Sequence, residues 1–170
     1  GEWVMIGAHR DAWGPGARDN VSGNATVLAA AAAFARAARA GMRPRRSILF
    51  ATWDAEEWGL IGSTEWVEAH ADEVEGAVVA YVNQDSPVGG PDFGASATPE
   101  LKLLVRNAAA AVSSPDGSGS VLARWTERSA KEELNQQPRV GDLGGGSDHV
   151  PFVQGLGIPG AGFGFSGSWG

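Results

Sequence analysis

The regular alternation of short apolar segments with longer helical ones is the feature that most constrains the fold of this sequence. Four apolar segments have the composition of strands, and an alanine-rich helix over 22–41, ended by a glycine, separates the first two. The expected strands are Trp3–His9, Ser47–Trp53, 76–83 and 157–165. Strands that alternate with helices predict a mostly parallel, mixed sheet with helices on both faces. We therefore expect a three-layer α/β/α sandwich.

Further helices are indicated by capping signals and periodic apolar residues. Thr98, Pro99 and Glu100 are the residue types that favour a helix start. The remaining helices are expected over 57–70, 98–112, 121–128 and 148–156. Outside the short helix over 121–128, the stretch 113–147 is predicted to be irregular.

Composition limits the classes of partner and site. The chain has 170 residues, which suits one domain that buries roughly 70% of its unfolded surface. Its net charge is −7 and its densest basic cluster is RPRR at 43–46, so nucleic acid is not an expected partner. No apolar run approaches the ~20 residues of a membrane-spanning helix. Without cysteine, any metal ligands must be His, Asp or Glu. We expect residues 1–170 to be one domain of a longer protein, truncated at both ends.

Acidic residues and one histidine follow three of the expected strands. The first strand ends at His9, with Asp11 and Asp19 in the loop behind it; Glu56 and Glu57 follow the second, and Asp85 follows the third. Each alone is ordinarily a turn, capping or solvated residue. Ligands of such sheets bind beyond the carboxyl ends of the strands, so the coincidence of these side chains favours a site. Imidazole and carboxylate groups bind zinc, and a carboxylate can bridge two metals ~3.5–4 Å apart.

Four stretches of the sequence together resemble a known family. They are GAHRDAWGPGARDNVSGNATVLA, RPRRSILFATWDAEEWGLIGSTEW, AYVNQDS and LGGGSDHVPFVQGLGIP, and they span about residues 3–165. The sequence resembles the co-catalytic zinc exopeptidases, nearest to the branch that contains glutamate carboxypeptidase II and the transferrin receptor. The resemblance implies a zinc-dependent metallo-exopeptidase of carboxypeptidase type, which hydrolyses peptide substrates with two zinc ions.

The resemblance also implies roles for individual residues. His9 and Asp85 match ligands of one zinc, Asp19 the bridging carboxylate, and Glu57 a ligand of the second zinc. Glu56 matches the general base that takes a proton from water. Two adjacent glutamates would thus divide the work between metal binding and proton transfer.

Further implied roles lie around these ligands. Asp11 matches an acid that orients the His9 ring. Gly146, Ser147 and Asp148 match a loop beside the substrate. The peptide bond between Asp19 and Asn20 is expected to be cis.

The sequence departs from the family's pattern at two places. The family's second zinc also takes a histidine, and neither His70 nor His149 matches it. The chain by itself is therefore expected to hold zinc weakly and to hydrolyse peptides poorly. His70 is expected to face solvent, and His149 lies in the loop beside the substrate. Gly162 and Gly164 stand where glutamate-preferring members are thought to carry arginines, so neutral or apolar terminal residues are the expected substrates.

Two alternative functions stay open at this point. One is a catalytically inactive interaction module like the transferrin receptor, and the other is an aminopeptidase of the same family. Every ligand that this stretch could supply is present, which favours an enzyme. The resemblance also allows a homodimer of the full-length protein and suggests an extracytoplasmic location.

Overall fold

The structure, a computed structural model, describes residues 1–132 and 138–168. Its strands are β1 (Trp3–His9), β2 (Ser47–Trp53), β3 (Val78–Asn83), β4 (Asp92–Ala97) and β5 (Gly160–Ser166). Its helices are α1 (Gly23–Arg39), α2 (Ile61–Ala69), α3 (Ala71–Ala77), α4 (Pro99–Ala111) and α5 (Val121–Glu132), with irregular helical turns η1 (Ala17–Ser22) and η2 (Pro151–Gly155). None of these helices is both long and apolar enough to cross a membrane within the described part of the chain.

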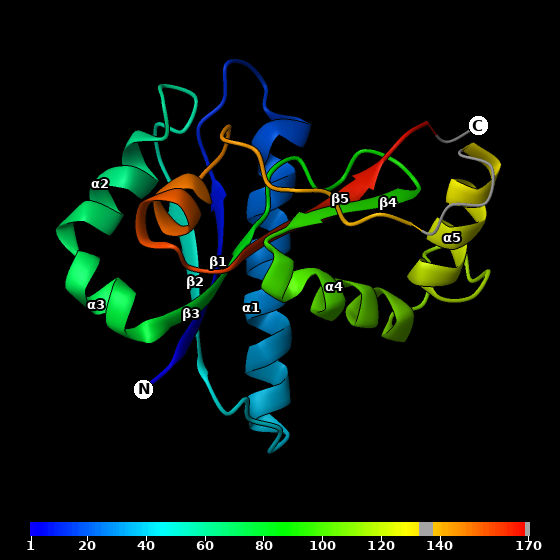
Figure 1. The fold of residues 1–170 in the computed structure, drawn as a ribbon, viewed down its shortest axis with the longest axis horizontal. Helices are drawn as coiled ribbons and strands as arrows, with labels where there is room; N and C mark the ends of the chain where they lie inside the picture. Colours follow the sequence, from blue (N-terminus) through cyan, green and yellow to red (C-terminus); the bar gives the residue numbers. More distant parts are fainter. Residues whose placement is uncertain (133–137, 169–170) are drawn as a thin grey trace.

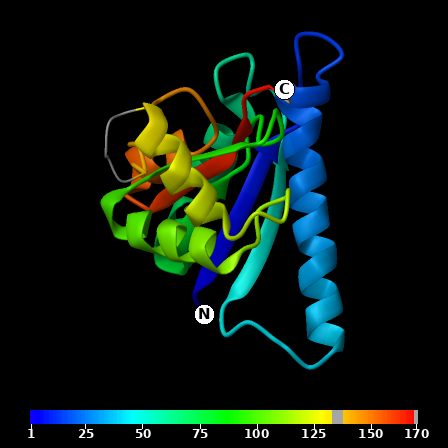
Figure 2. The same ribbon diagram turned by 90° about the vertical axis from the view of Figure 1, so that its right-hand side faces the viewer.

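The five strands form one mixed sheet in the order β2-β1-β3-β5-β4 (Figure 1). The pairs β1–β2, β1–β3 and β3–β5 are parallel, and β4 runs antiparallel to β5. The long helix α1 lies along one face, and the other helices gather on the opposite side (Figure 2). The predicted fold class, a mixed sheet between helices, is therefore confirmed.

Two hydrophobic clusters hold the helices on the sheet. The larger cluster joins β1–β3 to α2, α3 and η2, and the stacked rings of Tyr81 and Phe152 lie within it at a centroid distance of 4.1 Å. The smaller cluster joins β4 and β5 to α4 and α5 around Val105 and Trp125. The larger cluster packs against β1, β2 and β3, the three strands whose ends carry the site.

The strands Trp3–His9 and Ser47–Trp53 have the predicted bounds, but other elements differ. The strand β4 was not predicted, because its sequence DFGASA contains small residues with weak strand propensity. The third strand starts at Val78 rather than 76, because α3 continues through Ala77. The helix expected over 57–70 begins only at Ile61, after a turn in which Gly59 has a φ of 107°.

The last third of the chain differs from the prediction in both directions. The helix α5 extends to Glu132 instead of 128, whereas the helix expected over 148–156 is reduced to η2. The last strand begins at Gly160 rather than 157. Positions 133–137 of the stretch predicted to be irregular lie outside the described residues.

Candidate functional site

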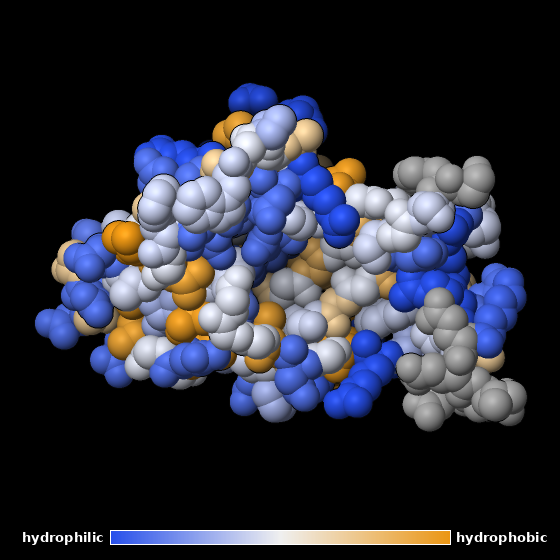
Figure 3. Space-filling view, turned by 90° about the horizontal axis from the view of Figure 1, so that it is seen from above, coloured by the Kyte–Doolittle hydropathy of each residue, from blue (hydrophilic) through white to orange (hydrophobic). Residues whose placement is uncertain are grey.

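The predicted site residues meet at the carboxyl edge of the sheet. His9 is the last residue of β1, Glu56 and Glu57 lie in the turn after β2, and Asp85 follows β3. Asp19 reaches the same place from η1. Figure 3 looks onto this edge, where hydrophilic residues lie beside a paler hollow. The residues that follow three neighbouring strands thus form one cluster, as the sequence predicts.

His9 is the centre of the cluster and is 1% exposed. Its Nε2 atom lies 3.1 Å from Asp19 Oδ1, 3.4 Å from Asp85 Oδ1 and 3.9 Å from Glu56 Oε2. Burial lowers the pKa of His9, but its hydrogen bond to Asp85 and the charges of Glu56 and Asp85 outweigh burial and raise it to about 9. A metal ion that binds Nε2 must therefore displace a proton.

Two groups of three side chains around His9 could each hold a metal ion. The potential ligand atoms of His9, Glu56 and Asp85 lie within 4.8 Å of one another, and the same holds for His9, Asp19 and Glu57. The adjacent glutamates therefore belong to different groups, and His9 belongs to both. This geometry alone would also let Glu56 bind a metal ion.

Asp11 organises the turn that carries these glutamates. Its two carboxylate oxygens accept hydrogen bonds from the backbone N–H groups of Glu56 and Glu57, each at 3.1 Å. Its backbone carbonyl oxygen lies 3.1 Å from His9 Nδ1, closer than its carboxylate at 3.5 Å. Asp11 thus contacts the His9 ring mainly through its backbone, and its side chain fixes the glutamate turn.

Glu56 has an environment suited to proton transfer. It is nearly buried, and burial raises its pKa to about 7, with His9 opposing the rise and Asp148 and Asp85 adding to it. A carboxyl group with a pKa near 7 can both accept and release a proton at neutral pH.

Asp85 is held by a chain of hydrogen bonds. The Ser147 hydroxyl donates to Asp85 Oδ2 at 2.8 Å and accepts from Asn83 Nδ2 at 2.8 Å. Because Asn83 Nδ2 can only donate, the hydroxyl proton of Ser147 is left for Asp85. Burial raises the pKa of Asp85, but the hydrogen bonds from His9 and Ser147 outweigh burial and keep it below its usual range. Asp85 Oδ1 stays directed at His9.

The three residues of the loop expected beside the substrate, 146–148, differ in burial and contacts. Gly146 is exposed, and Ser147 is buried with its hydroxyl engaged as described. Asp148 is wholly buried, and burial raises its pKa to about 6.

The two other histidines are outside both groups around His9, although His149 lines the same cleft as Asp85. His149 Nε2 bonds to the Gly144 carbonyl oxygen at 2.7 Å, and His70 stacks on Trp66. Neither belongs to the groups around His9, so the chain's three histidines supply one ligand.

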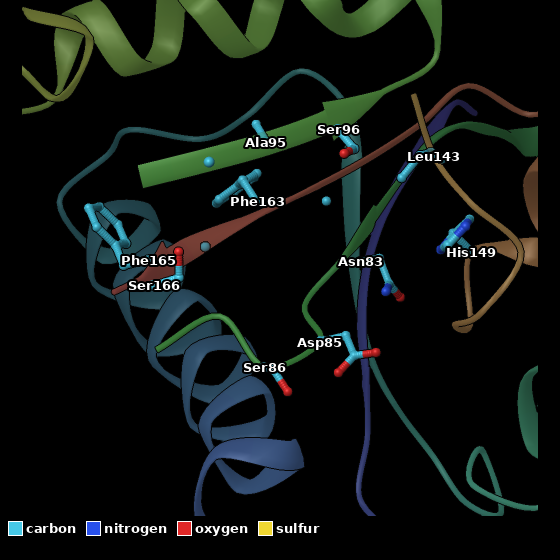
Figure 4. A pocket seen from close by; sticks show the side chains of 13 residues that line it. Asn83, Asp85, Ser86, Ala95, Ser96, Leu143, His149, Phe163, Phe165 and Ser166 are labelled. Atoms are coloured by element: carbon cyan, nitrogen blue, oxygen red, sulfur yellow. The ribbon is translucent and has the colours of Figure 1, made fainter. Parts of the chain in front are cut away.

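An open cleft of about 310 Å³ begins beside Asp85 and runs over the paired strands β4 and β5 (Figure 4). Asn83 and Asp85 lie at its inner end, and Phe163 and Phe165 lie along its wall. No lysine or arginine lines it among the described residues. The cleft therefore offers a partly aromatic surface next to the cluster, with His149 also in its lining.

Two residues near the site had no role assigned from the sequence. Asn20 follows Asp19 through a cis peptide bond, as expected, and is 1% exposed. Asn83 belongs to the N-x-D pattern that contains Asp85. Both residues belong to motifs visible in the sequence, D-N-x-S-G for Asn20 and N-x-D for Asn83. Their roles could not be read from the sequence, because their amides bond to residues more than 60 positions further along the chain.

Comparison with known proteins agrees with this geometry. The sequence matches Peptidase family M28 over residues 1–169. It is 43% identical over 164 residues to the probable glutamate carboxypeptidase LAMP1 of Arabidopsis thaliana, which covers 96% of this chain and 23% of that protein. It is 38% identical over 161 residues to aminopeptidase NAALADL1 of Mus musculus, with 92% and 22% covered. The chain thus spans less than a quarter of the length of either relative.

The fold also matches that of a zinc aminopeptidase from Bacillus subtilis. The TM-score is 0.58 at 24% identity, and the match covers 96% of this chain and 36% of that one. The match to nearly the whole sequence, with a shared fold, identifies the chain as a member of Peptidase family M28.

Proposed function

We propose that this chain is the catalytic core of a zinc-dependent exopeptidase that hydrolyses peptide bonds near a chain terminus. The observation that carries the proposal is the buried imidazole of His9, with carboxylates from three other segments within 4 Å of its Nε2 atom. Family membership supports the same activity.

The residues present fit zinc. Imidazole nitrogen and carboxylate oxygen are zinc ligands, and two overlapping groups of such side chains share His9. The resemblance to enzymes with two zinc ions supports two ions here. His9 and Asp85 would hold one ion, Glu57 the other, and Asp19 both. When bound, zinc polarises a carbonyl group and makes water a stronger acid. Because this chain supplies only Glu57 and Asp19 to the second ion, we expect that ion to be held more weakly.

Glu56 is the proposed general base. Its carboxylate faces the cluster, while Asp11 holds its backbone in place. It would accept a proton from the attacking water and deliver it to the leaving amine.

The aromatic wall of the cleft indicates the class of substrate. No lysine or arginine lines the cleft among the described residues, and the Nε2 atom of His149, which does line it, is bonded to the Gly144 carbonyl oxygen. Phe163 and Phe165 can pack against an apolar residue. We therefore propose peptides with a neutral or apolar terminal residue as substrates. Attack from the carboxyl end is favoured by the relative named a glutamate carboxypeptidase, and attack from the amino end by the relative named an aminopeptidase.

A peptide panel tests this function. Blocked and free dipeptides with alanine, leucine, phenylalanine or glutamate at either end are incubated with the zinc-loaded chain and with its Glu56→Gln variant. We expect slow, zinc-dependent release of apolar terminal residues by the wild-type chain, since it supplies few ligands to the second ion, and none by the variant. Equal rates for the two proteins, or no zinc requirement, would contradict the proposal.

A further inference from the structure

Asn20, next to the proposed bridging ligand Asp19, makes an unusual set of hydrogen bonds. Its Nδ2 atom donates to the Gln84 carbonyl oxygen at 2.9 Å. Its Oδ1 atom accepts from the N–H groups of Gly23 at 2.9 Å and Ser86 at 3.1 Å. One buried amide therefore joins the start of α1 to the segment after β3.

The two partners of Asn20 in that segment lie on either side of Asp85. The amide thus holds the backbone before Asp85 through Gln84 and the backbone after it through Ser86. The N–H group of Gln84 also donates to the Gly7 carbonyl oxygen of β1 at 2.8 Å. The backbone of Asp85 is consequently tied to the neighbour of Asp19 at two points.

Gly23 permits this contact. A Cβ atom at position 23 would lie 2.2 Å from both Asn20 Oδ1 and the Gln84 carbonyl oxygen. The backbone of Gly23 is ordinary helix, with a φ of −65°, so alanine is excluded there by contact and not by conformation. Asp19, Asn20 and Gly23 therefore form one structural unit within the DNVSG motif.

We propose that Asn20 is a positioning residue that sets the relative placement of the Asp19 and Asp85 carboxylates, and thereby the affinity of the site for zinc. The proposal rests on the proposed zinc function. Asp19 and Asp85 come from different loops, and their carboxylates must both approach His9. The Asn20 amide bonds to the backbone on both sides of Asp85, and Asn20 directly follows Asp19. It therefore fixes the position of one loop relative to the other. Ligand supports of this kind change metal affinity by about 10- to 100-fold when they are lost.

The test compares three variants of the whole chain. Asn20→Ala removes the amide, and Gly23→Ala displaces it without removing it. Val105→Ala, in the cluster between α4 and the sheet, is the control for a general loss of stability. Zinc affinity is measured by competition with a chromophoric chelator, and stability by urea unfolding of the metal-free proteins. Hydrogen exchange of the Ser86 amide is followed by NMR, with the Tyr81 amide as reference.

Asn20→Ala and Gly23→Ala should each weaken zinc binding by about tenfold or more. Val105→Ala should bind zinc within about twofold of wild type at a similar loss of stability. Alanine has a higher helix propensity than glycine, so a change in helix propensity alone would not weaken Gly23→Ala. Weakened zinc binding in this variant would therefore point to the displaced Asn20 amide and not to a weaker helix α1. The Ser86 amide should exchange faster in both site variants, whereas the Tyr81 amide, which donates to Pro159, should not.

Unchanged zinc affinity or unchanged Ser86 exchange in Asn20→Ala would overturn the proposal. Equal loss of affinity in Val105→Ala would reduce the effect to stability and overturn it as well. A wild-type chain that binds no zinc would contradict the proposed function instead, and Ser86 exchange would still decide whether Asn20 holds the Asp85 segment.

Discussion

Raising the pH from 6 to 9 should destabilise the metal-free protein by about 3 kcal/mol, because the folded state holds a proton on His9 that the unfolded chain has lost. The pKa of His9 rises from 6.5 to about 9 on folding. Each unit of difference between the folded and unfolded pKa corresponds to about 1.4 kcal/mol of stability. A group with a raised folded pKa stabilises fully below its unfolded pKa, and the contribution disappears as the pH rises through the folded pKa.

Neighbouring groups do not reverse this sign. Glu56 has its pKa raised from 4.5 to about 7, so it too binds more protons when folded and adds to the loss of stability up to that pH. Asp85 has a lowered pKa, and its contribution is lost only as the pH falls through that lowered value, outside the interval. Against a typical total stability of about 5–15 kcal/mol, the change is large.

The assay is urea unfolding followed by circular dichroism at pH 6, 7, 8 and 9 with a chelator present. The wild-type free energy of unfolding should fall across the series. His9→Asn should show a smaller fall, with the remaining slope due to Glu56 and Asp148, whose pKa values His9 otherwise holds down. Added zinc should reverse the trend, because ligands bind metal in their deprotonated form. A metal-free wild-type profile that is flat or rises with pH would refute the reasoning.

Other changes at the site should separate the roles of its residues. Glu56→Gln should lower turnover by about 10²–10⁴-fold with zinc retained. Glu57→Gln should first lower zinc occupancy, and its activity should recover in part with added zinc. Identical behaviour of the two variants would refute the division of work. Ser147→Ala should weaken zinc binding by about tenfold because Asp85 loses its hydroxyl donor, and Ser147→Thr should restore it; a silent Ser147→Ala would contradict this role. Gly162→Arg should shift peptide preference toward acidic terminal residues, because a Cβ there has no neighbour closer than 3.5 Å, and an unchanged preference in the peptide panel would argue against the cleft as the side-chain site.

Much of the fold was predictable from the sequence because the buried parallel strands have strong local signals. Trp3–His9 and Ser47–Trp53 are continuous apolar segments, and their bounds were predicted correctly. In contrast, β4 forms because β5 offers it an antiparallel partner, with Gly94 opposite Gly164. Such pairing between segments that contain many small residues and lie over 60 residues apart leaves little trace in local propensity.

In the site, too, features set by the local sequence could be predicted, whereas contacts between distant segments could not. His9, Glu57 and Asp85 could be placed together because parallel strands end at one edge of a sheet. The positions of amide partners could not be predicted, since Asn20 bonds to residues 64 and 66 positions further along the chain. Likewise, the carboxylate of Asp11 was expected to orient His9, but it mainly holds the turn of Glu56 and Glu57.

Anomalous X-ray scattering at the zinc edge, measured on crystals of the chain grown with zinc, tests the central claim most directly. The account predicts two peaks about 3.5–4 Å apart at the carboxyl edge of the sheet. The stronger should lie against His9 and Asp85, and the weaker against Glu57, with Asp19 between them. Peaks only at His70 or His149, or no peak within the cluster around His9, would contradict it.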